Sequence, residues 1–241
     1  MIDLSGLPVV DVHCHPFLNR GPLTAEEFTN LASFGGGSVA YMEQGGIPVD
    51  DALRAELQRV KRDTVYFRRL VRDLAAFFGT EPDLDAVLAA RNDAVSAGYS
   101  AYVQRLYADA NLETLIFDFG YPVPNLALDA VREELPVEVV PVLRIEPLIA
   151  GLLATDIGWT EFRARFDGTI SEALTNGGYR GLKSIIAYRT GLEVSPVSRS
   201  PDQGMQALDA IRRGLGGGSM KMLRDLLLCR AMELAMEHAV P

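Results

Sequence analysis

The sequence predicts an α/β fold in which four parallel strands alternate with helices. Four short apolar runs are rich in β-branched residues and are bounded by glycine, proline or charged residues, as are the buried strands of a parallel sheet. Helical patterns separate the later runs, and this rhythm favours right-handed βα units. Between the first two runs lies a long stretch with no convincing strand pattern.

The predicted elements follow the chain in a regular order. The predicted strands are residues 8–15 (PVVDVHCH), 113–120 (ETLIFDFG), 138–146 (EVVPVLRIE) and 179–188 (YRGLKSIIAY). The predicted helices are residues 125–135, 159–175, 201–215 and 220–239, the last two being separated by a glycine-rich break.

Residues 16–110 are predicted to be a helical insertion after the first strand. Apolar side chains recur there at helical spacing, namely Val60, Phe67, Leu70, Val71, Leu74, Phe77 and Phe78. We therefore expect a single α/β domain over residues 1–241 that carries this insertion.

The composition is typical of a globular protein in solution. Of the 241 residues 48% are hydrophobic and 23% are charged, so we expect neither a membrane span nor a disordered chain. The net charge of -9 would repel phosphate backbones, which argues against nucleic acid as a partner. The first residues lack the features of an export signal, which predicts a cytoplasmic protein whose Cys14 and Cys229 are reduced thiols.

Two of the three histidines lie at the end of the first predicted strand. Side chains alternate along a strand, so His13 and His15 point to the same side, where two imidazoles can bind one metal ion. Asp11 is on the same face and could orient an imidazole from outside the ligand shell. Reactive groups of parallel βα folds gather at the carboxyl ends of strands, which is where this pair lies. The alternative is that both histidines only bond backbone carbonyls at a strand exit.

The pattern D-x-H-x-H-P after an early apolar strand resembles the first strand of the amidohydrolase superfamily of metal-dependent (β/α)8 barrels. The segments IFDFGYP (116–122), VLRIE (142–146) and GYRGLKSIIAYRTGL (178–192) resemble strand ends of its amidohydrolase-2 branch, whose members can carry a long helical insertion after strand one. The resemblance therefore implies a TIM-barrel type fold with a divalent metal, zinc first and manganese second.

The resemblance also suggests a role for Lys183 in the fourth strand. Two-metal members of the superfamily use a strand-four lysine, carboxylated by carbon dioxide, to bridge their ions. Lys183 could instead contact an anionic substrate or be structural. Arg144, Tyr188 and Arg189 are expected to reach the same mouth and bind substrate, because a guanidinium suits a carboxylate. Internal salt bridges are the alternative for such residues, and Asp118 is a further candidate at the mouth.

Only about four βα units are found, whereas a (β/α)8 barrel takes about 250 residues without insertions. The resemblance implies further histidines from strands five and six and an aspartate from strand eight, and none of these strands is recognised. We therefore expect an incomplete barrel that corresponds to the N-terminal portion of such an enzyme. Its open edges predict either homo-oligomerisation or contact with a missing C-terminal half.

The expected function is that of an amidohydrolase-2 type hydrolase acting on a small anionic substrate through metal-activated water. One alternative is a decarboxylase or isomerase on the same scaffold, because a fold does not fix its chemistry. The second alternative is a catalytically inactive half-barrel that serves binding or assembly.

Overall fold

The computed structural model describes residues 6–17, 19–33, 38–120, 126–194 and 200–241. The chain divides into two compact units, one of Met1–Phe17 with Asn111–Pro241 and the other of Leu18–Ala110. The first unit holds the sheet and is described first.

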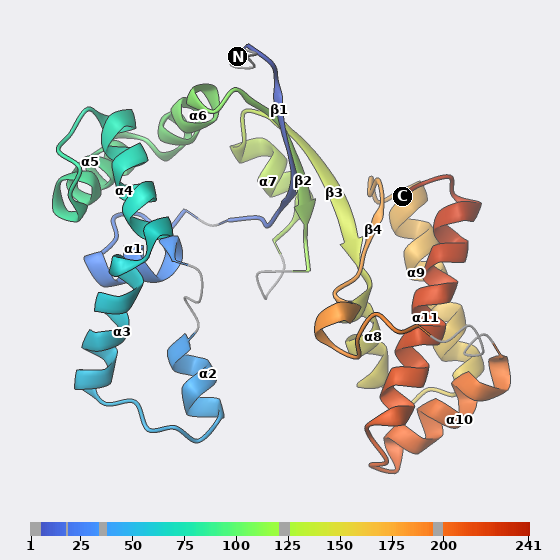
Figure 1. The fold of residues 1–241 in the computed structure, drawn as a ribbon. Coiled ribbons are helices and arrows are strands. Elements are labelled where there is room, and N and C mark those ends of the chain that lie inside the picture. The colour runs from blue at the N-terminus through green and yellow to red at the C-terminus, as the bar shows by residue number, and fades with distance from the viewer. Residues whose placement is uncertain (1–5, 18, 34–37, 121–125, 195–199) are drawn as a thin grey trace. The chain divides into compact units, whose positions relative to one another are not determined.

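Four parallel strands form the sheet in the order β1-β2-β3-β4 (Figure 1). They are β1 (Val9–Cys14), β2 (Leu112–Asp118), β3 (Glu138–Arg144) and β4 (Leu182–Lys183). The sheet is a curled half-barrel, so the predicted α/β fold with four parallel strands is confirmed. Because all four strands are parallel, their carboxyl ends lie on one side of the sheet, with Asp118 opposite Val142 and Arg144 opposite Lys183.

Helices follow the strands and contribute most of the core of this unit. They are α7 (Leu128–Glu134), α8 (Ile145–Leu153), α9 (Trp159–Thr175), α10 (Pro201–Arg212) and α11 (Gly218–Glu237), with the short 3-10 helix η1 (Ile186–Tyr188) after β4. The largest fully buried side chains of this core are Phe162, Phe166, Ile170, Leu208, Leu223, Leu227 and Leu234. Helices α9, α10 and α11 therefore pack against one another through apolar faces.

The predicted third and fourth strands were too long. The third ends at Arg144 instead of residue 146, because α8 begins at Ile145 directly after an extended Arg144. The fourth shrinks from residues 179–188 to Leu182–Lys183, and the apolar residues that follow it turn into η1. By contrast, α9 has the predicted bounds. The predicted helix 125–135 is observed as α7, with residue 125 outside the described residues.

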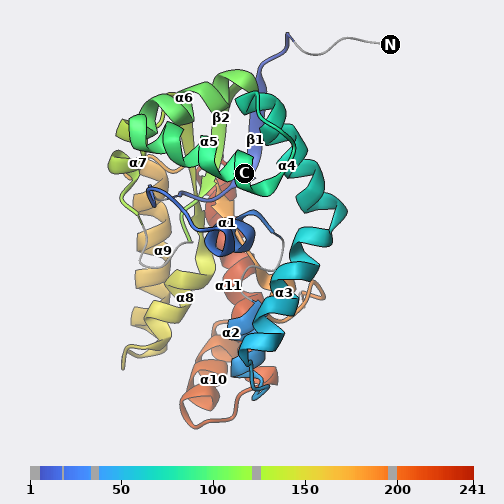
Figure 2. The ribbon, with the colours of Figure 1, turned by 90° about the vertical axis from the view of Figure 1, so that its left-hand side faces the viewer.

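In the described residues of the second unit, 19–33 and 38–110, the chain forms six helices (Figure 2). They are α1 (Ala25–Ala32), α2 (Ser38–Gln44), α3 (Asp51–Asp63), α4 (Val65–Phe78), α5 (Leu84–Ala97) and α6 (Tyr99–Asp109). Its core joins α1, α4 and α5 through Phe28, Phe67, Val71, Ala75, Val87 and Leu88. Side-chain caps begin four of the helices, for which Thr24, Asp50, Thr64 and Asp83 each accept a backbone N–H. In the described parts of both units, none of the helices has the length and apolar character that a membrane span needs.

Candidate metal centre

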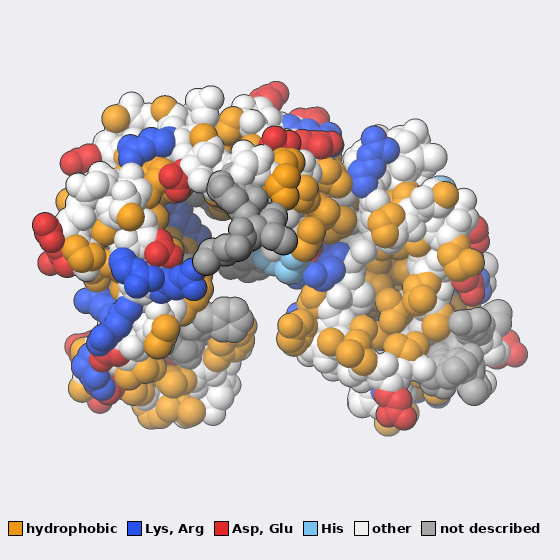
Figure 3. All heavy atoms as spheres, turned by 45° about the horizontal axis from the view of Figure 1, so that its top comes forward, with side chains coloured by type: hydrophobic (Ala, Val, Ile, Leu, Met, Phe, Trp, Pro, Cys, Tyr) orange, Lys and Arg blue, Asp and Glu red, His pale blue; other side chains and the backbone are white. Residues whose placement is uncertain are grey.

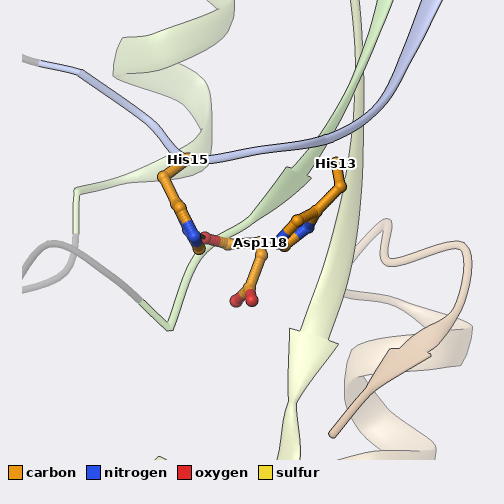
Figure 4. Close-up of side chains that lie close together, drawn as sticks. All are labelled: His13, His15 and Asp118. Atoms are coloured by element: carbon orange, nitrogen blue, oxygen red, sulfur yellow. Dashed lines mark hydrogen bonds between the residues drawn. The ribbon is translucent and has the colours of Figure 1, made fainter. Parts of the chain in front are cut away.

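The end of β1 brings the two histidine rings together. The centroids of the His13 and His15 rings are 5.2 Å apart and the ring planes meet at 76°. Both side chains point to the same side of the sheet, with Asp118 between them (Figure 4). The register of β1 against β2 shifts between Asp11 and Cys14, which is where the strand leaves the sheet.

A backbone contact sets the tautomer of His15. Its Nδ1 lies 3.0 Å from the backbone carbonyl oxygen of Asp118. A carbonyl can only accept a hydrogen bond, so Nδ1 carries the proton and Nε2 carries the lone pair. This is the arrangement by which proteins orient an imidazole for metal binding.

Asp118 completes a group of three potential ligands. It is the last residue of β2, it is fully buried, and its carboxylate has a ligand atom within 4.8 Å of those of His13 and His15. Its Oδ1 accepts a hydrogen bond from the Gly120 N–H at 2.9 Å, and its Oδ2 accepts one from Arg144 Nε, also at 2.9 Å. Oδ2 also accepts from Arg144 Nη2, which uses both of its lone pairs, whereas Oδ1 keeps one lone pair that a cation could take.

Arg144 forms an internal ion pair with Asp118. This was the alternative to the predicted substrate contact of Arg144. Its guanidinium donates to Asp118 from both Nε and Nη2, and its side chain is largely buried. The pair compensates the charge of a carboxylate that lies entirely out of solvent. Asp11, by contrast, accepts a hydrogen bond from the backbone N–H of His13 at 3.0 Å and not from an imidazole.

Lys183 extends from β4 to His13. Its Nζ lies 3.3 Å from both Nδ1 and Nε2 of that ring. Partial burial and then the positive charge of Lys183 lower the pKa of His13 from its usual value. At neutral pH the ring is therefore uncharged, as a metal ligand must be.

Cys14 lies between the histidines but belongs to the other face of the strand. Its Sγ contacts the backbone oxygen of Ile116 at 3.6 Å. Burial, together with the negative charge of Asp11, raises the pKa of the Cys14 thiol to about 12. The thiol is turned toward the backbone of β2, and it is not one of the three side chains whose ligand atoms converge.

Glu146 fixes the turn that follows β4. Its Oε1 accepts hydrogen bonds from Ser184 Oγ at 2.6 Å and from the Ile185 N–H at 2.7 Å. Because β4 pairs with β3 over only two residue pairs, this carboxylate holds the strand end that carries Lys183.

Replacing Glu146 by alanine is expected to lower the free energy of unfolding by about 2–3 kcal/mol, because a charged acceptor with two donors is lost. Denaturant unfolding measures the change. The matched control is Glu161→Ala, which breaks an exposed pair with Arg165 and should cost less than about 1 kcal/mol. Equal losses in the two variants would show that Glu146 does not brace the turn.

The remaining predicted site residues lie outside this group of three ligands. Tyr188 is 86% exposed on η1, and Arg189 follows it as an exposed residue. The positive charge of Arg189 acts on Arg224 of α11, whose pKa is lowered by burial first and by Arg189 second, while Glu146 acts in the opposite sense. In the space-filling view the histidine surface adjoins basic side chains (Figure 3).

Asp118 and Gly120 are the residues whose roles sequence reasoning missed or weighted too lightly. The available signal was the segment FDFG at the end of the second predicted strand, which puts an acid and a glycine at the same edge as the histidines. What the sequence could not supply was the contact of both residues with Arg144.

The chain is thus a parallel half-barrel with imidazoles and a carboxylate at its strand ends, and a protein of known structure shares this fold. A crystal structure of a candidate metal-dependent hydrolase from Lactobacillus casei ATCC 334 matches with a TM-score of 0.72 and 20% sequence identity, over 99% of this chain and 57% of that chain. At this identity the likeness establishes the fold alone.

Sequence comparison gives a narrower match. Protein fluG of Emericella nidulans is 26% identical in an alignment of 152 residues, which covers 55% of this chain and 17% of the fungal protein. No family model matches the chain. The chain thus spans less than a fifth of the fungal relative and little more than half of the Lactobacillus protein.

Proposed function

We propose that this chain is a metal-dependent hydrolase of the amidohydrolase-2 type that acts on a small anionic substrate. One observation carries the proposal: ligand atoms of His13, His15 and Asp118 lie within 4.8 Å of one another at the carboxyl end of a parallel sheet. Proteins of parallel βα architecture place their chemistry at this edge.

The residues present fit a divalent cation. Two imidazoles and one carboxylate are a ligand set that catalytic zinc sites use, and manganese accepts the same donors. The backbone carbonyl of Asp118 holds His15 in the tautomer with the proton on Nδ1, so Nε2 is the nitrogen that would bind the metal. Imidazole is a preferred ligand of zinc, whereas manganese prefers carboxylate and other oxygen ligands, so two imidazoles beside one carboxylate support zinc as the first expectation.

When bound, a divalent cation supplies Lewis acidity that makes water nucleophilic near neutral pH. His13, His15 and Asp118 would hold it, and Arg144 would keep Asp118 in place from behind. Lys183 has two proposed roles. As an ammonium it would attract an anionic substrate, and as a carboxylated lysine it would supply an anionic ligand.

The ammonium of Lys183, 3.3 Å from the His13 ring nitrogens, supports an anionic substrate. Arg189 is exposed after β4, the strand that carries Lys183, and its positive charge acts on Arg224 of α11. We propose that Arg189 orients a carboxylate of the substrate, with exposed Tyr188 beside it in the chain. Decarboxylation or isomerisation of such an acid would use the same residues.

The test is the metal content of the purified chain after loading with zinc or manganese. We expect roughly one ion per chain. In His13→Ala the affinity should fall at least about tenfold, because a ligand is removed. His238→Ala is the matched control, since that histidine caps α11 and contacts Ser171. A chain that binds neither metal would instead support the catalytically inactive assembly module.

A further inference from the structure

Strands β1 and β4 lie at the two edges of the half-barrel. In the described part of the chain β1 pairs with β2 alone among the strands, and β4 pairs with β3 alone. An unpaired edge strand is a template for another strand. Both edges belong to the unit that carries the candidate metal centre.

The β1 edge exposes apolar side chains. Val9, Val10 and Val12 are 43%, 49% and 72% exposed. Alternation along the strand puts Val10 and Val12 on the face opposite His13. In a barrel that outer face is the one covered by helices.

The β4 edge exposes a matching apolar surface. Helix α11 follows β4, and its Met232 and Met236 are 60% and 81% exposed. A cavity of about 150 Å³ lies between the strand and the helix, lined by Leu182, Leu228, Ala231, Met232 and Ala235 among others. In a right-handed βα unit the helix covers its own strand and the next one in the sheet. A strand paired to the free edge of β4 would therefore pack its outer face against the exposed surface of α11.

We propose that two copies of this chain close one eight-stranded barrel, in which β1 of each copy pairs in parallel with β4 of the other. Four strands from each copy give the number whose interior side chains just fill a barrel. All four strands are parallel, so a two-fold axis along the barrel leaves the strands of both copies pointing the same way. The strand order β1 to β4 of one copy then continues into β1 to β4 of the other. The two-fold arrangement closes without leaving a strand edge.

Side-chain chemistry also matches across the proposed contact. Val10 and Val12 of one copy would lie under Met232 and Met236 of the other, which buries apolar surface on both. The outer edge of β4 already takes a backbone partner, since the Leu182 N–H donates to the carbonyl oxygen of Pro241 at 2.9 Å. Pairing of β1 there replaces this single bond, worth about 1 kcal/mol, with a ladder.

Closure would place a second pair of histidines beside Lys183. In each copy the two imidazoles and the carboxylate come from one chain. Lys183 on β4 would in addition have His13 and His15 of the partner subunit on the strand next to it. Only this last step rests on the proposed function. The pairing itself follows from the sheet edges.

Light scattering of the purified chain tests the pairing without reference to metal. The expected mass is twice the 26.3 kDa of one chain. Val12→Glu and Met232→Lys should each give a monomer, because either charge is placed in an apolar contact. Val65→Glu is the matched control, since Val65 is 85% exposed on α4 of the helical unit, and it should remain a dimer.

Mixing the two monomeric variants gives the decisive result. An equimolar mixture of Val12→Glu and Met232→Lys should regain the dimer mass, because one contact then has opposite charges and the other is unaltered. Unfolding curves of each variant establish that it is folded. A monomeric wild-type chain, an open-ended series of oligomers, or a mixture that stays monomeric would overturn the proposal. A monomer that binds one zinc would contradict the pairing but support the proposed function. A dimer that binds no metal would support the pairing but contradict the proposed function.

Discussion

Replacing Arg144 by methionine is expected to lower the free energy of unfolding by about 3–5 kcal/mol, because it leaves a buried carboxylate without its counter-charge. Asp118 has 0% of its side chain exposed and Arg144 only 13%. Methionine keeps much of the volume of the arginine stem, so the change isolates the charge. Denaturant unfolding in the presence of a chelator measures the loss without a contribution from bound metal.

Two further variants separate charge from packing in this prediction. Adding Asp118→Asn to Arg144→Met should recover part of the loss, since the buried charge is gone while the acceptor for the Gly120 N–H is kept. Arg165→Met is the surface control. It breaks an exposed pair with Glu161 and should change stability by less than about 1 kcal/mol. A double variant less stable than Arg144→Met alone would contradict the charge explanation.

Zinc should restore stability to Arg144→Met more than to the wild-type chain, if the proposed centre is correct. A cation bound to Asp118 supplies the positive charge that the arginine provided, and binding to the folded state alone adds stability. The comparison of unfolding with and without zinc would show no such difference if Asp118 were not a ligand.

The sequence was sufficient for elements whose apolar pattern is long or sharply bounded. Strand β1 and helix α9 were predicted nearly to the residue, because β-branched runs and a full amphipathic repeat leave little ambiguity. Helix α8 was missed because IEPLIAGLL is a short apolar run directly after a strand, and a run of that kind fits strand and helix alike. The length of β4 depends on pairing with β3 and on Glu146, which no local pattern encodes.

The same division holds for the candidate site. His13 and His15 could be paired from strand alternation, since the two residues are neighbours on one face. The contacts of Lys183 with His13 and of Arg144 with Asp118 join residues 170 and 26 positions apart. Those contacts depend on strand register and on curling of the sheet. The sequence therefore predicted that these residues lie at one edge of the sheet, but not which pairs of side chains are in contact.

Gly120→Ala is expected to disturb the centre through Arg144, although position 120 offers no ligand atom. A Cβ there would lie 2.5 Å from Arg144 Cδ and 2.7 Å from its Cβ and Nε. Because Cβ is next to the backbone, Arg144 cannot yield by moving only its tip, and overpacking of this kind costs about 1–3 kcal/mol. The guanidinium would be pushed from Asp118, and zinc affinity should fall about 10- to 100-fold, as for other groups that orient ligands.

The same substitution at Gly168 should have the opposite sign. Gly168 lies within α9, and a Cβ there would meet nothing within 4 Å. Alanine is favoured over glycine in a helix interior, so Gly168→Ala should raise the free energy of unfolding by about 0.5–1 kcal/mol and leave zinc binding unchanged. Isothermal titration with zinc and denaturant unfolding of both variants give the two readouts. If Gly120→Ala bound zinc as tightly as Gly168→Ala, the Arg144 contact with Asp118 would have no part in holding the centre.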